Sequence, residues 1–148
     1  NKIVLEALND KKIKNLQNYN NIKPEFKFSD GTRFDFLLSN NKEKCILEVK
    51  NVTLMRRNKL AEFPDSITSR GSKHLNELCL AIKKNYKSYI LYLIQKESCD
   101  SFKIAKDIDN DYKIAFDKAL KCGVKILCYN CKLTNEEIIL NNQIIYEK

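Results

Sequence analysis

Two charged side chains interrupt an apolar, strand-like stretch, "ILEVKNVTL" at residues 46–54. Residues two apart in a strand point to the same face, so Glu48 and Lys50 project together, away from the face of Leu47 and Val49. Burying such an ion pair breaks even at best. Considered alone, the strand therefore fits a surface-facing edge about as well as it fits a functional site.

Two further acidic residues lie in the strand-like runs just before this stretch. Asp35 lies inside "RFDFLL", and Glu25 opens the run before it. If the three runs pair in order, at about 4.8 Å between strands, we expect Glu25, Asp35 and Glu48 to converge at one end of the sheet. Three carboxylates without matching bases repel one another, and a hard divalent cation relieves the repulsion. We therefore interpret these three residues as candidate ligands of Mg²⁺ or Mn²⁺.

A carboxylate-bound metal next to a lysine can hydrolyse a phosphodiester. The metal polarises a phosphoryl oxygen and lowers the pKa of a bound water. Lys50 would orient or activate that water and stabilise charge in the transition state. The candidate catalytic residues are thus Asp35, Glu48 and Lys50. Their spacing, D-x12-E-x-K, resembles the PD-(D/E)xK nuclease signature, which is loose and also occurs in unrelated proteins.

Periodicity predicts the elements that position these residues. Helical spacing covers residues 2–17, and strand-like runs at 25–28, 33–38 and 44–50 are separated by turn residues, which predicts a three-stranded antiparallel meander. Residues 53–63 are expected to form a charged loop. A helix then begins at Pro64 and Asp65, with a buried stripe made of Ile67, Gly71, Leu75, Leu78 and Ile82. Gly71 in that stripe would let another backbone approach closely.

The second half of the chain alternates strands and helices. Residues 89–95 are apolar on both faces, which predicts a central strand. A helix follows over 107–123, capped by Asp109 or Asn110 and ended by Gly123. A strand at 124–130 and a hairpin on an Asn-Asn turn complete the order α-β-β-β-α-β-α-β plus C-terminal hairpin. This order predicts a single α/β domain over residues 1–148, with a PD-(D/E)xK nuclease-like core whose mixed central sheet is flanked by helices.

The formal charge of +8 favours a polyanion partner such as DNA or RNA, although a chain rich in Lys, Asn and Ile also becomes basic through AT-rich coding. Six cysteines without a second CxxC or a nearby histidine favour reduced thiols in the cytoplasm over zinc. No apolar run approaches the roughly 20 residues of a membrane span. The start at Asn1 is typical of a segment of a longer chain or of a processed terminus.

Basic residues also gather on the first predicted helix after the meander. In "TSRGSKHLNEL" at 68–78, helical spacing brings Arg70 and His74 together, with Lys73 nearby. These side chains could hold a nucleic-acid phosphate, and His74 could assist proton transfer. A solvated face is the alternative. The same two readings apply to Arg56 and Arg57, which follow the candidate strand.

Longer stretches carry a more specific signal. The words "TRFDF", "CILEVKNVTL", "FPDSITSRGSKHLNEL", "SFKIAKDIDNDY" and "GVKILCYNCKL" occur in this order. Together they resemble the sugar fermentation stimulation protein A (SfsA) family, over nearly the whole chain from about Ile3. Thr32 stands where the family usually has Ser, and Ser66 where it commonly has Ala.

The resemblance implies a nuclease-like C-terminal domain, and the smaller N-terminal OB-like domain of the family is expected to be absent from this chain. It implies a nucleic-acid-binding, divalent-metal-dependent nuclease of DNA or RNA, with Asp35, Glu48 and Lys50 as the signature triad and Glu25 where the family also has an acid. The alternative is a non-catalytic DNA-binding regulatory protein linked to sugar metabolism. A homodimer is left open. The supporting or nucleic-acid-binding residues would be Arg33, Thr68, Arg70, Lys73 and His74.

Overall fold

The computed structural model describes residues 1–148, which form an α/β fold built on two sheets. The main sheet has the spatial order β1 (Asn21–Ser29), β2 (Thr32–Ser39), β3 (Lys44–Val52), β6 (Lys87–Ile94), β8 (Lys125–Leu133) and β9 (Ile138–Gln143). The smaller sheet has the order β10 (Ile145–Glu147), β7 (Ser101–Ile104), β5 (Leu60–Phe63) and β4 (Leu54–Arg57). The helices are α1 (Lys2–Asn9), the short 3-10 helix η1 (Lys14–Leu16), α2 (Ser69–Lys83) and α3 (Asn110–Cys122).

The predicted meander and the mixed central sheet are confirmed. Strands β1, β2 and β3 pair antiparallel in order, whereas β3, β6 and β8 run parallel and β9 returns antiparallel to β8. Parallel neighbours need crossover connections, and α2 and α3 supply them. Strand β6 lies at the centre and is buried from Ser88 to Ile94, as its apolar sequence predicts.

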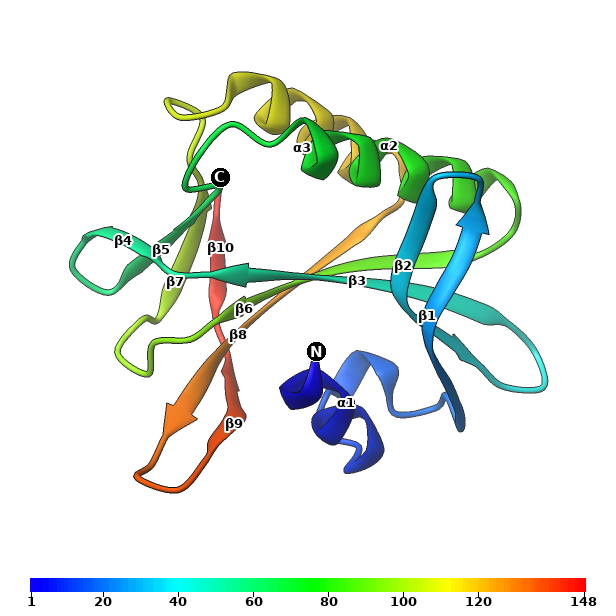
Figure 1. The fold of residues 1–148 in the computed structure, drawn as a ribbon, viewed down its shortest axis with the longest axis horizontal. Coiled ribbons are helices and arrows are strands. Elements are labelled where there is room, and N and C mark those ends of the chain that lie inside the picture. Colours follow the sequence, from blue (N-terminus) through cyan, green and yellow to red (C-terminus); the bar gives the residue numbers. More distant parts are fainter.

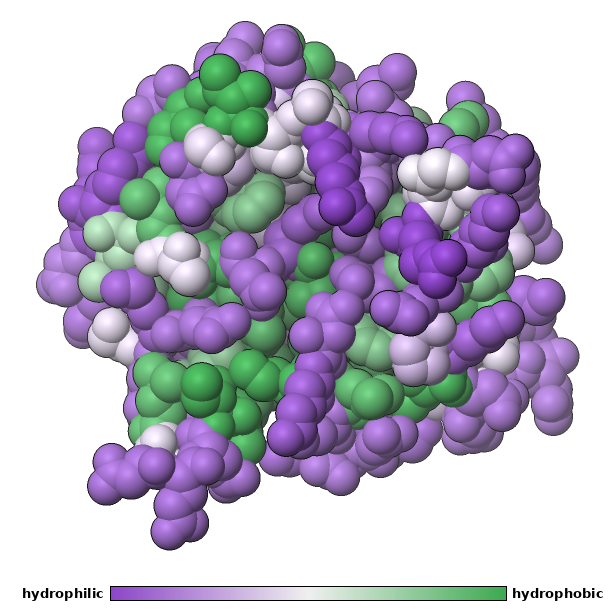
Figure 2. All heavy atoms as spheres, in the orientation of Figure 1, coloured by the Kyte–Doolittle hydropathy of each residue, from purple (hydrophilic) through white to green (hydrophobic).

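Two hydrophobic cores lie on the two faces of the main sheet. Alternation along β3 sends Ile46 into one core, together with residues of α2 and α3, and sends Leu47 into the other, together with residues of α1. Figure 1 shows this arrangement, with α2 and α3 above the sheet and α1 below it. Hydrophilic side chains cover most of the face seen in Figure 2. None of the helices has the length and apolar character that crossing a membrane requires.

Residues 53–63 and the C-terminus differ from the expected structure. The expected loop contains β4 and β5, and the strand β7 was not expected. The expected hairpin on an Asn-Asn turn is wrong, because β9 pairs with β8, whereas β10 joins the smaller sheet in parallel with β7. The pairing of β10 with β7 joins segments far apart in the sequence, so no local turn signal marks it, whereas β8 and β9 form a local hairpin closed by the Thr134 N–H, which donates to the Glu137 carbonyl.

The helix boundaries also need correction. Helix α1 ends at Asn9, and Lys11 follows with a φ of 58°, which interrupts the helical pattern that extends to residue 17. Helix α2 begins at Ser69 and not at Pro64, because the Thr68 hydroxyl caps it by accepting from the Gly71 N–H. Ile67 therefore lies outside the helix and is 80% exposed, so its assignment to the buried stripe was wrong.

Gly71 does allow a close approach, but by side chains and not by the backbone that its place in the stripe predicts. A Cβ at this position would lie 3.0 Å from the Tyr112 ring of α3. Helix α3 begins after the Asp109 cap and ends at Gly123, which has a φ of 105°, as its sequence predicts. These contacts fix α2 over the sheet, and α2 carries part of the candidate site.

Candidate active site

Asp35 and Glu48 occupy the point where β2 and β3 separate. The last backbone pair of this ladder is Phe36 with Leu47, so Asp35 and Glu48 are the next positions in register. Here side chains replace backbone pairing. The Asp35 N–H donates to Glu48 Oε2 at 3.3 Å, and the Val49 N–H donates to Asp35 Oδ2 at 2.8 Å. The parting strands thus hold two carboxylates side by side.

Lys50 and His74 complete a compact polar group with Glu48. Lys50 Nζ donates to Glu48 Oε1 at 3.2 Å, and His74 Nδ1 lies 3.0 Å from the same oxygen. Lys50 Nζ and His74 Nδ1 are 3.1 Å apart. If Nδ1 carries a proton it donates to Glu48, and if it does not it accepts from Lys50. The group can therefore relocate one proton without moving a heavy atom.

This group lies beneath α2. Glu48 and His74 are each 4% exposed, and the imidazole packs edge-on to the Phe34 ring. The strand is therefore not a surface-facing edge, which was the alternative left open by the sequence. Buried charges require partners, and α2 supplies one for Glu48 in His74.

Burial and neighbouring charges move the two carboxylates in opposite directions. Burial, and then the charge of Glu48, raise the pKa of Asp35 above its ordinary value. Burial also raises the pKa of Glu48, but the hydrogen bonds and charges of His74 and Lys50 outweigh it, and the net pKa is lowered. Asp35 is thus the carboxylate without an ion-pair partner, and the charge of Lys50 offsets only part of the rise in its pKa.

Glu25 does not join the two carboxylates. Its neighbours pair as Pro24 with Phe36 and Phe26 with Phe34. This register would place Glu25 opposite Asp35, yet these two residues do not pair. Glu25 has a φ of 55°, a conformation that a non-glycine residue rarely adopts, and it is exposed. No group of three or more His, Cys, Asp or Glu side chains is placed to hold a metal ion. The expected convergence of three carboxylates is therefore reduced to two, and metal binding stays a prediction.

A basic cleft of about 670 Å³ opens beside His74, between the β1–β2 turn and the first turns of α2. No acidic or apolar residue lines it; its walls are Lys27, Ser29, Gly31, Thr32 and Arg33 from the hairpin and Ser69, Arg70, Lys73 and His74 from α2. The sequence-predicted residues Arg33, Arg70, Lys73 and His74 are thus brought together. Thr68 lies outside the cleft, where it caps α2 and donates its N–H to Asp109.

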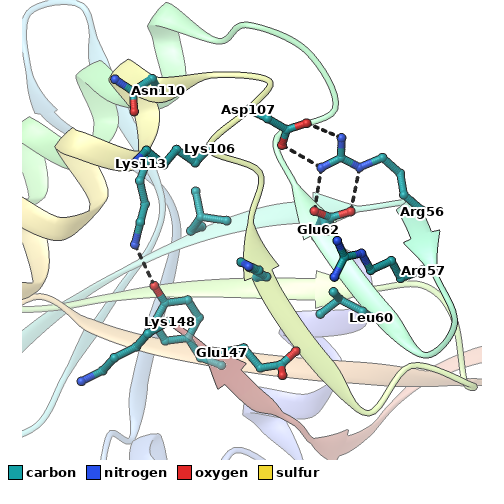
Figure 3. Close-up of a pocket in the computed structure, with 13 residues that line it drawn as sticks. Arg56, Arg57, Leu60, Glu62, Lys106, Asp107, Asn110, Lys113, Glu147 and Lys148 are labelled. Carbon is teal, nitrogen blue, oxygen red and sulfur yellow. Dashed lines mark hydrogen bonds and ion pairs between the residues drawn. The ribbon is translucent and has the colours of Figure 1, made fainter.

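A larger cavity of about 890 Å³ lies elsewhere, over the smaller sheet and the start of α3. The candidate catalytic residues Asp35, Glu48 and Lys50 do not line this cavity. Figure 3 shows Arg56 in this cavity between Glu62 and Asp107. Its guanidinium donates to the carboxylate oxygens of both residues at nitrogen–oxygen distances of 2.6–2.9 Å. The Arg56 hydrogen bonds lower the pKa of Asp107 to about 2. Arg56 is therefore committed to a structural clamp, and the phosphate contact considered for it has no support here.

Two features near the site have no signal in the sequence. The Asn1 side chain donates to Asp35 Oδ1 at 2.6 Å, although the two residues are far apart in the chain. Thr32 is 2% exposed, and its hydroxyl has no hydrogen-bond partner. Only the folded structure reveals either one, since both depend on long-range packing.

Comparison with known proteins decides the family. A family model described as "Sugar fermentation stimulation protein RE domain" matches residues 1–137. The chain belongs to the SfsA family. The resemblance seen in the sequence is thereby confirmed.

Individual SfsA relatives agree. A sugar fermentation stimulation protein homologue of Pelagibacter ubique is 51% identical over 144 residues, which are 97% of this chain and 62% of the relative. The homologue of Roseobacter denitrificans is 41% identical over 139 residues, 93% of this chain and 59% of the relative. The chain therefore spans about three fifths of the length of these relatives. Their names state no reaction.

A solved structure supports the fold. Pyrococcus furiosus SfsA, described in complex with Ca²⁺, superposes with a TM-score of 0.88 at 24% identity, covering 97% of this chain and 62% of that one. At this identity the likeness concerns the fold alone. It confirms the predicted mixed α/β architecture.

Proposed function

We propose that this chain is the catalytic domain of a divalent-metal-dependent nuclease that hydrolyses phosphodiester bonds in DNA or RNA. One observation carries the proposal. The paired carboxylates of Asp35 and Glu48 lie beside Lys50 and His74, and His74 also lines a cleft that has no acidic residue. Acidic ligands, a half-buried amine and a cationic channel are the parts that such hydrolysis requires.

The residues present fit a hard divalent cation. Asp35 and Glu48 are oxygen donors, and the raised pKa of Asp35 reflects burial and an adjacent charge that a cation would offset. The Pyrococcus relative was solved with Ca²⁺, which supports a divalent site in the family. We propose Mg²⁺ or Mn²⁺ as the working ion here, with Glu25 as a further ligand if its strand rearranges. Such an ion would polarise the phosphate and acidify a bound water.

The protein groups have separable roles. Lys50 is a compact donor that would orient the attacking water and offset charge on the phosphate. His74 Nδ1, in reach of both Lys50 and Glu48, would hold or return the proton that Lys50 shares. Glu48 would keep both bases in place through its Oε1 atom. Val49 would orient Asp35 through its backbone N–H.

The partner that fits the surface is a nucleic acid. Arg33, Arg70 and Lys73 lie on the two walls of the basic cleft, and the formal charge of the chain is +8. Phosphates gain affinity from such side chains by counterion release. The buried thiols fit a reducing compartment, so we also propose a cytoplasmic location.

A non-catalytic DNA-binding regulator is the second candidate. The observation that favours it is that no three-ligand group is assembled for a metal. In that case the acidic residues would only support the fold, and binding would depend on salt and on the basic cleft.

The decisive experiment is a cleavage assay with Mn²⁺ and Mg²⁺ on single- and double-stranded DNA and RNA. It compares the wild type with Lys50→Ala and with Lys103→Ala, a control that removes an exposed cation from the other cavity. We expect cleavage by the wild type and the control, and a loss of 100-fold or more, on the order expected for a general base, in Lys50→Ala. Salt-dependent binding without cleavage of any substrate would establish the regulator instead.

A further inference from the structure

The Thr32 hydroxyl is the one buried side-chain polar atom without a hydrogen-bond partner. Thr32 is 2% exposed, begins β2 and lines the basic cleft. A buried hydroxyl without a partner destabilises the folded state, and native proteins keep few of them. A partner that comes from outside the chain accounts for it.

The cleft around Thr32 is built for an anion. Arg33 and Arg70 face it and form no ion pair, and Lys73 Nζ donates only to the Gly31 carbonyl, at 3.2 Å. No carboxylate lines the cleft. Cations collected in one concavity repel one another, so the arrangement lowers its electrostatic energy when an anion enters.

The start of α2 adds donors to the same cleft. Ser69 and Arg70 are the first two residues of this 15-residue helix, and both line the cleft. The Thr68 hydroxyl accepts a hydrogen bond from the Gly71 N–H, and the Thr68 carbonyl accepts one from the Ser72 N–H. The backbone N–H groups of Ser69 and Arg70 have no partner within the chain, and the helix dipole makes this end attractive to negative charge.

We propose that the basic cleft is a phosphate-binding subsite, in which Thr32 donates to a phosphate oxygen and Arg33 and Arg70 neutralise its charge. The inference deepens the proposed nuclease function and rests on it for the identity of the substrate. Because His74 lines the cleft and also contacts Glu48 and Lys50, the bound phosphate is one that lies next to the bond to be cut. The phosphate belongs either to a strand end or to the interior of the strand.

Thr32→Val tests this proposal through two effects of opposite sign, on stability and on binding, and Thr32→Ser is its control. Valine keeps the shape of threonine and removes the unpaired hydroxyl, so the ligand-free variant should melt higher, by about 2–4 °C. The same variant should bind inorganic phosphate and short oligonucleotides about tenfold more weakly, since a hydrogen bond to a charged group is lost. Thr32→Ser keeps the hydroxyl and should retain the binding.

The binding is measured by calorimetry without divalent metal, so that it does not depend on cleavage. Arg70→Ala should weaken binding, whereas Lys103→Ala should leave it unchanged. Oligonucleotides with a 5′-phosphate, a 3′-phosphate or neither are compared. Preference for one phosphorylated end identifies a strand-end subsite, and equal affinity identifies an internal phosphate; both support the proposal.

Two results would overturn it. A lower melting temperature for Thr32→Val would show that the hydroxyl supports the fold, through a buried water for example. Unchanged phosphate affinity in the same variant would show that Thr32 is not a ligand. Neither result depends on nuclease activity, so an inactive wild type that binds phosphate through Thr32 would refute the proposed function and leave the subsite intact.

Discussion

Asp35 and Glu48 face each other across β2 and β3, one step beyond the last paired residues of that ladder. The backbone of Asp35 donates to the carboxylate of Glu48, and the backbone of Val49 donates to the carboxylate of Asp35. A ladder that opens in this way turns backbone donors into supports for acidic side chains. The arrangement brings two carboxylates close together, and their repulsion destabilises the fold. Only Glu48 forms ion pairs, with Lys50 and His74.

That repulsion predicts a stabilising but inactivating substitution. In Asp35→Asn the amide oxygen can still accept from Val49, and the repulsion with Glu48 disappears. We expect a gain of about 1 kcal/mol at neutral pH, seen as a rise of about 2–4 °C in melting temperature. Cleavage should be lost. A variant less stable than the wild type at neutral pH would contradict this reading of the pair.

The pH dependence of that difference has a definite sign. The folded-state pKa of Asp35 is raised, so its destabilising effect is present above that pKa and disappears as the pH falls toward the unfolded value of about 4. The gain of Asp35→Asn should therefore shrink on acidification. Glu48 behaves in the opposite way, because its lowered pKa gives a contribution that is lost as the pH falls through the folded-state value. Melting curves from neutral pH down to about pH 4 follow the effect of Asp35, and curves continued below about pH 4 follow the loss at Glu48.

Divalent metal should stabilise the protein through the same carboxylates. At a free Mn²⁺ concentration of about 100 times its dissociation constant, the free energy of unfolding should rise by about 2.7 kcal/mol. Glu48→Gln should lose this increment, and so should Asp35→Asn. Thermal shift with and without a chelator measures it, with Lys103→Ala as the unaffected control. Equal metal-induced rises in melting temperature in the wild type and in Glu48→Gln would show that the metal binds at another site.

The contact between α2 and α3 leaves no room at Gly71. A Cβ there would lie 2.9 Å from the Thr68 side chain and 3.0 Å from the Tyr112 ring, whose hydroxyl bonds to Tyr92 in the core. Gly71→Ala should lower the free energy of unfolding by about 1–2 kcal/mol, because overpacking outweighs the better helix propensity of alanine. Asn76→Ala, on the exposed face of α2, should cause no loss. Urea denaturation compares the two.

The Arg56 clamp should matter for stability and not for catalysis. Removing Arg56 leaves the buried Glu62 carboxylate without its cation, so Arg56→Ala should lower the melting temperature. The neighbouring Arg57 makes no ion pair, and Arg57→Ala should be neutral. Cleavage rates at a temperature where both variants are folded should match the wild type. A selective loss of activity in Arg56→Ala would instead give this arginine a part in substrate binding.

The sequence alone determined the order of the meander and the faces of its strands. Turn residues between short apolar runs limit the pairing to neighbours, and the two-residue period of a strand puts Glu48 and Lys50 on one side. From that register Asp35 falls beside Glu48. The caps of α3 were readable for the same reason, since Asp109 and Gly123 act within a few residues of their own position.

Only the tertiary structure decided which distant groups meet. The approach of His74 to Glu48 depends on where α2 crosses the sheet, and its first turn is set by a cap that Asp109 of another element supports. In the smaller sheet β7 pairs with β5 and β10, which lie far from it along the chain. Glu25 has a positive φ and does not pair with Asp35, so it stays apart from the two carboxylates. Such contacts are fixed by long-range packing and backbone pairing, because residue types record the chemistry a side chain offers but not which distant surface will bury it.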